Sequence, residues 1–276
     1  MKKQFLIFLF FLPLPLFAQV TNVRAGQSGQ DIVITYDLAE SAEVRAYMSV
    51  GGLPFVELHS AQGDVGCVPQ GANRTITWSP LAESDEFVAD NVAFKVEALH
   101  AFVDLGLPSG TLWATCNVEA NSPEEFGGYF AWGEVESKES FSWENYKWGT
   151  RYNLTKYNNV DKLLVIEPID DAATANWGQN WRMPSVEQWK ELKFYCKETE
   201  MDSAGVHGSL FVSRKNGNSI FFPFSGIKTD ERFLWGLFFE FWENSISEKN
   251  PDRAYCTDAC LVRCSGRSVR PIYNKK

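Results

Sequence analysis

Apolar and polar side chains alternate along much of residues 19–100 with the period of half-buried β-strands. Residues 44–50 show this best, since Val, Ala, Met and Val alternate with Arg, Tyr and Ser before a turn at Gly51-Gly52. Three other runs are rich in β-branched and aromatic residues: 31–37, 74–78 and 92–98. Short strands separated by turns predict an all-β sandwich, whose simplest role is that of a spacer.

Residues 101–276 mix helical and strand patterns, and one helix start is well marked. Ser185-Val-Glu-Gln188 is a capping box, in which the serine hydroxyl accepts from the amide of the third helical residue and Gln188 reaches back. Trp189, Leu192 and Cys196 then fall on one helical face. The sequence therefore predicts a helix that begins after Ser185.

The other elements of this part are shorter. Residues 122–125 repeat the capping pattern, but Gly127-Gly128 ends that helix within a turn. Strands are predicted at 219–224 and 268–272. The βαβ alternation of a doubly wound parallel sheet is missing, so the fold class predicted for residues 101–276 is α+β.

Residues 135–169, called the long loop below, have neither a period of 2 nor one of 3.6. A stretch of this length without regular structure is usually functional or disordered, and its aromatic content argues against disorder. We therefore predict an ordered loop that contacts a ligand. The aromatic residues assigned to this contact are Trp143, Tyr146, Trp148, Tyr152 and Tyr157.

A second aromatic run covers residues 233–242 and holds one charged residue. As core it would be a buried strand or helix, which is the interpretation we favour. As surface it would be a large apolar patch of the kind that marks an interface. Trp235 and Trp242 are included as candidate ligand contacts, because rigid amphipathic indole faces suit sugar rings and protein anchors alike.

The first 18 residues read as a secretory signal. Lys2 and Lys3 precede an apolar run over residues 5–12, and Ala18 offers a small residue at the cleavage point. The run is too short for a membrane span, which needs about 20 residues. We expect an exported protein (periplasmic, on the cell surface or secreted) with no membrane insertion after cleavage.

The chain is acidic. Loss of Lys2 and Lys3 with the signal takes the formal net charge from −9 to −11. Nucleic acid is a poor partner for such a chain, because phosphates are neutralised by Lys and Arg.

Cysteine usage leaves several pairings open. Export permits disulfides, and six cysteines allow about 15 full pairings. A domain boundary near residue 100 leaves one cysteine on the N-terminal side and five on the C-terminal side. Because both counts are odd, either Cys67 pairs across the boundary or at least two thiols stay free. For the three C-terminal cysteines, Cys256, Cys260 and Cys264, a local disulfide or burial is a better interpretation than a zinc site, because zinc prefers four ligands. The cysteines are Cys67, Cys116, Cys196, Cys256, Cys260 and Cys264.

Catalytic motifs are scarce. The three histidines lack the spacing of a zinc protease, and neither a Gly-x-Ser-x-Gly elbow nor a phosphate-binding glycine loop occurs. Carboxylate pairs for glycoside hydrolysis are set in space and leave no sequence pattern. We therefore predict a non-enzymatic protein, with no catalytic residues and no cofactor assigned.

Several motifs in fixed order carry a family resemblance. Together they resemble the Fibrobacter succinogenes major paralogous domain, a secreted module frequent in Bacteroidetes, over residues 101–276. Residues 19–100 resemble the immunoglobulin-like or fibronectin-type modules that precede other domains in such proteins. The motifs are VDLGLPSGTLWATCN at 103–117, GYFAWGE at 128–134, the segment 177–185, GNSI at 217–220 and SVRP at 268–271.

The run at 181–189, WRMPSVEQW, also resembles the strand-to-helix segment of formylglycine-generating enzymes, which share a C-type lectin-like architecture. The resemblance implies an α+β domain with two helices, a curved antiparallel sheet and a long loop region that carries ligands. It makes Arg182 and Pro184 structural, with Ser185 and Gln188. The tryptophans expected in the core are Trp113, Trp132, Trp177, Trp181 and Trp189.

Two departures limit what the resemblance implies. The calcium motif of sugar-binding C-type lectins follows the second helix, whereas the Glu-Pro here, at Glu167, precedes it. No metal site is assigned, and the carboxylates to test for calcium are Glu167, Asp170 and Asp171. The C-terminal cysteines do not match the reactive pair of the formylglycine enzymes.

These observations favour a non-catalytic binding module for a glycan or for an extracellular or cell-surface protein. The main alternative is a structural or assembly component of the cell envelope that oligomerises through residues 233–242. A formylglycine-generating-like enzyme comes third. A minor motif, Asp202-Ser203-Ala204, resembles a Bacteroidetes O-glycosylation acceptor and makes Ser203 a candidate site.

Overall fold

The computed structural model describes residues 20–39, 41–83, 87, 89, 91–230, 233–234, 238–257 and 259–273. The predicted signal, residues 1–18, and Trp235 lie outside the described residues. Strand makes up 44% of the chain and helix 9%, which confirms the predicted preponderance of β structure. No helix in the described part combines the length and the apolar character needed to cross a membrane.

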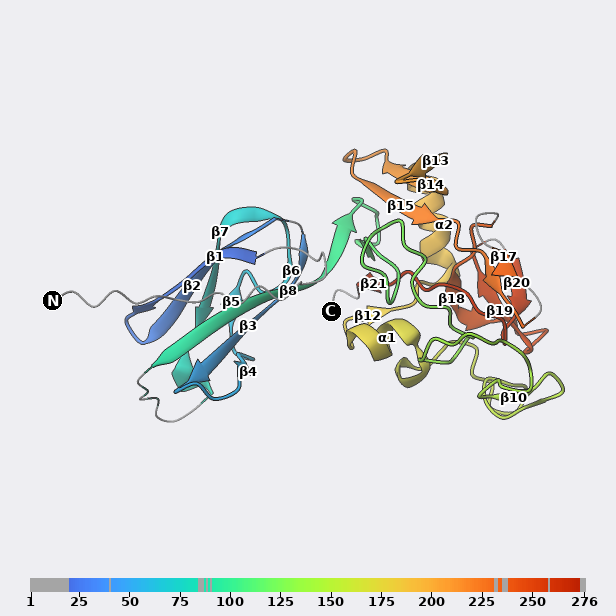
Figure 1. Cartoon of the computed structure of the whole chain (residues 1–276), viewed down its shortest axis with the longest axis horizontal. Coiled ribbons are helices and arrows are strands. Elements are labelled where there is room, and N and C mark those ends of the chain that lie inside the picture. The colour runs from blue at the N-terminus through green and yellow to red at the C-terminus, as the bar shows by residue number, and fades with distance from the viewer. Residues whose placement is uncertain are drawn as a thin grey trace.

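The N-terminal part consists of two antiparallel arrays of strands around one hydrophobic core (Figure 1). One sheet has the order β1-β2-β7-β5, and in the other β3 pairs with β4, β6 and β8. Alternate residues of β2, β3 and β7 point into the core, as their period predicts. The strands are β1 (Val20–Ser28), β2 (Asp31–Leu38), β3 (Ala42–Val50), β4 (Val56–Glu57), β5 (Gln62–Gly63), β6 (Gly66–Val68), β7 (Gly71–Trp78) and β8 (Val92–Asp104).

Strand β8 is longer than the sequence predicts and passes through the expected boundary at residue 100. Its first part pairs with β3, and its end, Phe102–Asp104, pairs with β9 (Leu112–Ala114). Beyond β9 the same sheet continues through β21 (Ile272–Tyr273) to β12 (Trp181–Arg182). One sheet therefore extends from the N-terminal part into the C-terminal part (Figure 1).

The C-terminal part is built from short antiparallel sheets with two helices, α1 (Ala172–Trp177) and α2 (Val186–Tyr195). A three-stranded sheet, β13-β14-β15, follows α2 directly, and a second one has the order β18-β19-β20. The remaining elements are η1 (Pro80–Ala82), β10 (Gly149–Thr150), β11 (Asn153–Leu154), η2 (Pro168–Asp170), β13 (Cys196–Ser203), β14 (Val206–Ser213), β15 (Ser219–Pro223), β16 (Ile227–Lys228), β17 (Phe233–Leu234), β18 (Trp242–Ile246), β19 (Arg253–Cys256) and β20 (Ala259–Val262).

The predicted helix start at Ser185 is confirmed. The Ser185 hydroxyl accepts from the Gln188 amide, and the Gln188 side chain accepts from the Ser185 amide at 3.0 Å. Gln188 also accepts from Arg182 Nη1 at 3.0 Å, which ties the preceding strand to the cap. Trp189 and Leu192 are buried on the predicted face. The short helix predicted at 122–125 is a single turn without helical residues.

The tryptophans expected in the core are buried, except Trp177, which is half-buried against it. Trp189 sits in an aromatic cluster with Trp113, Phe222 and Phe241. Phe241 and Trp242 are fully buried, so the end of the 233–242 run is core, as favoured. Phe241 and Trp242 therefore cannot contribute to an interface formed by that run.

A buried carboxylate joins the two parts of the chain. Glu43 on β3 accepts from the indole of Trp181 on β12 at 2.8 Å and from Arg45 Nη2 at 3.0 Å. Asn180 adds a third donor at 3.3 Å. A carboxylate in so dry a place is stable only while its donors remain.

Replacing Trp181 with Phe should therefore destabilise the protein by about 1–3 kcal/mol, because it leaves a buried acceptor without its donor. Urea unfolding measures the loss. The matched control is Trp113→Phe, since the Trp113 indole N–H is also buried but makes no hydrogen bond among the described residues. Equal losses in the two variants would show that the bond to Glu43 contributes nothing.

Candidate functional site

The long loop is ordered although it contains little regular structure. Its hairpin, β10 and β11, lies at the end of the C-terminal part farthest from the N-terminal sheets (Figure 1). At its C-terminal end the loop pairs with β18, where Ile166 N donates to Asn244 O at 2.8 Å. Between these points the backbone has no ladder partners, so its carbonyl groups need other donors.

The side chain of Arg263 supplies those donors. Its Nη1 donates to Tyr157 O at 2.8 Å and to Pro251 O at 3.0 Å, and its Nη2 donates to Lys156 O at 2.9 Å. Its Nε donates to the Tyr146 hydroxyl at 2.6 Å. Arg263 is completely buried, so one side chain fixes both limbs of the loop from inside.

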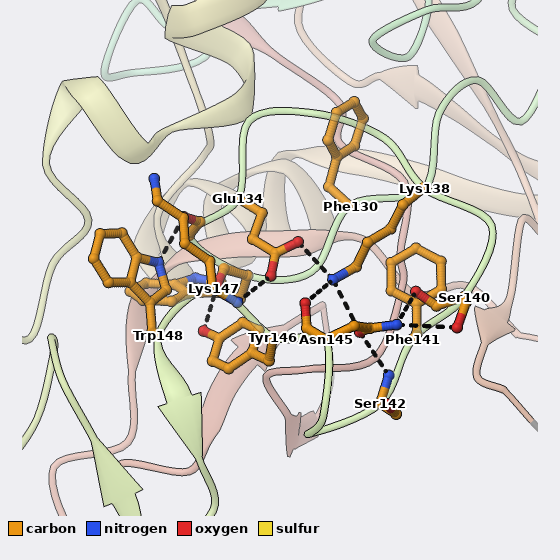
Figure 2. A network of polar contacts seen from close by, with 12 residues as sticks. Phe130, Glu134, Lys138, Ser140, Phe141, Ser142, Asn145, Tyr146, Lys147 and Trp148 are labelled. Atoms are coloured by element: carbon orange, nitrogen blue, oxygen red, sulfur yellow. Dashed lines mark hydrogen bonds and ion pairs between the residues drawn. The ribbon is translucent and has the colours of Figure 1, made fainter.

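The N-terminal limb of the loop is held by a network of side chains around Glu134 and Lys138 (Figure 2). Glu134 accepts from the Lys147 backbone amide and from Lys138 Nζ, both at 2.8 Å. Lys138 Nζ also donates to the Asn145 carbonyl at 3.1 Å. The Asn145 amide in turn donates to Ser140 O at 3.1 Å. These bonds all join residues within the segment 134–147 and hold its two ends together.

Asp170, a candidate for calcium, is occupied by the protein's own donors. Lys156 Nζ lies 2.6 Å and Tyr157 Oη 2.8 Å from its Oδ2, and Lys147 Nζ lies 3.1 Å from its Oδ1. Burial would raise the pKa of Asp170, but these hydrogen bonds outweigh burial and lower it. The second candidate, Glu167, pairs with Lys156.

Asp171 is equally committed. It caps α1 by accepting from Ala173 N at 2.8 Å and Thr174 N at 3.3 Å, and its other oxygen accepts from Met183 N at 2.9 Å. Its burial raises the pKa to about 6, against these hydrogen bonds. Within the described residues, His, Cys, Asp and Glu side chains form no group of three that could hold a metal ion.

The aromatic residues assigned to ligand contact divide into two groups. Tyr146, Tyr157 and Trp242 are buried and belong to the core, so assigning them to ligand contact was wrong. The burial of Tyr146 and Tyr157 could not be predicted from the sequence, because both lie on irregular backbone and not on the apolar face of a helix or strand. Trp143 and Trp148 are half-buried.

The exposed part of the loop carries apolar side chains. Tyr152, at the turn between β10 and β11, is 92% exposed, and Val160 and Ile169 are 91% and 76% exposed. Trp148 lies nearby on the loop, with Lys147 Nζ 4.4 Å from its ring centroid. Tyr152 was predicted from its aromatic character, whereas Val160 and Ile169 were not predicted because no periodic pattern singles them out.

The cysteines with described side chains offer little reactivity. Burial raises the pKa of Cys196 and of Cys264 to about 11 and that of Cys256 to about 12. Cys256 is paired with Ala259, and Cys260 with Tyr255, so Cys256 and Cys260 point to opposite faces of the β19–β20 hairpin. The local disulfide between these two is therefore excluded by the register. The side chain of Cys67 lies outside the described residues.

Ser203, the candidate for O-glycosylation, ends β13 at the turn to β14. Ala204 and Gly205 in that turn both have positive φ. The Ser203 hydroxyl is half-buried and donates to Glu124 Oε1 at 2.7 Å. Modification would have to break this bond, and glycosylation of Ser203 remains a prediction.

Comparisons of the chain with protein-family models, curated protein sequences and solved structures found no match. What the chain does must therefore be argued from its own chemistry.

A pH effect on stability should arise from Asp171. Because its pKa rises from 3.8 to about 6 on folding, its contribution is complete below pH 3.8 and is lost as the pH rises through 6. Asp171→Asn does not titrate. Between pH 4 and 7 the wild-type unfolding free energy should fall by up to about 3 kcal/mol relative to the variant's. Denaturant unfolding at several pH values measures this, and a constant difference between the two proteins would contradict it.

Arg263→Lys should loosen the long loop. Lysine cannot reach all four acceptors, so buried carbonyl groups lose their donors at a total cost of about 2–5 kcal/mol. Unfolding in urea gives the cost, and limited proteolysis should cut within residues 149–162 first. Arg151→Lys is the control, since Arg151 is half-exposed and its pair with Asp252 at 3.0 Å lies at the surface. Similar proteolysis of both variants would contradict the anchoring role of Arg263.

Proposed function

We propose that residues 101–276 form a C-type lectin-like domain of the Fibrobacter succinogenes major paralogous family and that the protein is a non-catalytic binding module for a glycan or an extracellular protein. The proposal is supported by two helices, antiparallel sheets and an ordered long loop in this part of the chain. The N-terminal part has the antiparallel strands of an immunoglobulin-like module.

One observation carries the binding role: the long loop exposes apolar side chains while its backbone is held from within. Arg263 binds the loop carbonyls, whereas Tyr152 and Ile169 face solvent. A pre-organised loop loses little conformational entropy when it binds, and exposed aromatic side chains are frequent anchors of recognition. Tyr152 would be the central contact, and the half-buried rings of Trp143 and Trp148 are further candidates on the same loop.

The alternatives have less support. A thiol-dependent enzyme needs a cysteine with a lowered pKa, and burial raises the pKa of Cys196, Cys256 and Cys264. Among the described side chains of residues 233–242, Phe238 is 41% exposed and available for assembly, whereas Phe241 and Trp242 are buried. We therefore keep the envelope component as the second candidate. Export through a cleaved signal at residues 1–18 is part of the proposal.

The proposal predicts a defined ligand on an array of glycans and extracellular-matrix proteins. Tyr152→Ala should weaken its binding about tenfold or more, because an anchoring aromatic residue commonly contributes over 1 kcal/mol. EDTA should have no effect, since Asp170 and Asp171 are occupied by protein donors. The control is Tyr255→Ala, which removes a tyrosine that lies on β19, outside the loop.

Two results would count against this view. Binding that is lost in EDTA but retained in Tyr152→Ala would replace the aromatic surface with a calcium site. An array without any hit would favour the assembly role, which native mass measurements on the wild type and on Phe238→Ser would then test.

A further inference from the structure

A large hollow of the described structure lies where the two parts of the chain meet, and its lining includes no residue of the long loop. This junction cleft has a volume of about 870 Å³, within the usual size of ligand sites. Strand β8 forms its floor through Phe102 and Val103. One rim comes from the N-terminal part, at Ser41 and Gln70, and the other from residues 121–123 and 217–219.

The chemistry of the cleft is neutral. Its polar side chains are hydroxyls and amides, and Asp104 is the one carboxylate among the described lining residues, which include no Lys, Arg or His. Pro123 adds half-buried apolar surface, and the lining also includes the buried side chains of Phe102 and Leu112. An anionic ligand would find no counter-charge there, and a cation would find a single carboxylate. The lining fits a neutral molecule with many hydroxyl groups and apolar faces, which is the chemistry of a sugar.

The rims present hydrogen-bonding groups that the fold does not use. The backbone of Gln70 is held, because its amide donates to Ser41 Oγ at 3.0 Å and its carbonyl accepts from Arg74 at 2.7 Å. Its side-chain amide makes no bond within the described residues. Asn218 donates through Nδ2 to Asp104 O at 2.8 Å, which positions its Oδ1 as an acceptor. Ser219 adds an exposed hydroxyl beside it.

We propose that the junction cleft is a second binding site and that it takes a neutral oligosaccharide. Gln70 and Ser219 hydrogen-bond its hydroxyls from opposite rims, Asn218 accepts from one, and Pro123 contacts its apolar face. An amide offers both donors and an acceptor, so it can bind two neighbouring sugar hydroxyls at once. This site needs both parts of the chain and does not depend on a ligand at the long loop.

The test is a calorimetric titration of the full chain with cellohexaose, xylohexaose, mannohexaose, maltoheptaose and chitohexaose. We expect binding of at least one of them. Gln70→Ala should weaken it roughly threefold to tenfold, the effect of losing one or two neutral hydrogen bonds. Ser219→Trp should abolish it by filling the cleft. Gln62→Ala, which removes an exposed glutamine on β5, and Tyr152→Ala should leave it unchanged.

No binding to any of the five sugars would overturn the proposal, as would equal affinity in wild type and Ser219→Trp. If Tyr152→Ala abolishes binding of a sugar and Ser219→Trp retains it, the sugar binds at the long loop. This result would overturn the junction site and support the proposed function. Should Ser219→Trp fail to fold, as judged by its thermal unfolding, the comparison of Gln70→Ala with Gln62→Ala decides.

Discussion

The placement of the long loop depends on one buried guanidinium group. Arg263 has five N–H donors in a planar fork, and the loop presents carbonyl groups that no strand satisfies. Arg263 donates to the backbone oxygens of Lys156 and Tyr157 in the loop and to that of Pro251 outside it. The cation is stabilised by these dipoles, by the rings of Trp132, Tyr146 and Tyr157, whose centroids lie 5.3 Å or more from it, and by the charge of Asp161. The exposed side chains of the loop are therefore positioned by the buried side chain of Arg263.

The same device recurs along the C-terminal segment. Arg267 donates to Glu240 at 3.0 Å and lies 4.5 Å from the Trp242 ring, and Arg270 donates to Asn117 Oδ1 at 2.7 Å and to Thr115 O at 2.7 Å. Burial lowers the pKa of Arg270 to about 10, and this desolvation outweighs the attraction of the Glu124 carboxylate, which acts in the opposite direction. Val269, between these arginines, and Ile272, after them, belong to two different hydrophobic clusters. The last strand of the domain thus completes its core, so core formation must wait for contacts distant in sequence.

Local patterns were enough to predict β2, β3, β7, the first part of β8 and the capped helix α2, because each carries a period or a cap that can be read within a few residues. Strands β1, β4, β5 and β6 were not predicted. Strand β13 was missed, since its exposed run of Lys, Glu and Asp lacks apolar alternation and is held by pairing with β14. The roles of Arg263 and of the buried Tyr146 and Tyr157 were missed for a related reason. A loop carries no period, and its partners lie about a hundred residues away.

The boundary predicted near residue 100 lies within the single strand β8. The sequence changes character near residue 100, and a linker is the usual inference, yet β8 crosses that point as one strand and Glu43 accepts hydrogen bonds from the far side. A flexible linker would let the N-terminal part act as a spacer alone. A shared sheet instead fixes the Gln70 rim relative to Asn218 across β8. Such a cleft loses little entropy on binding, and it shares no lining residue with the long loop, so the two proposed sites are separate.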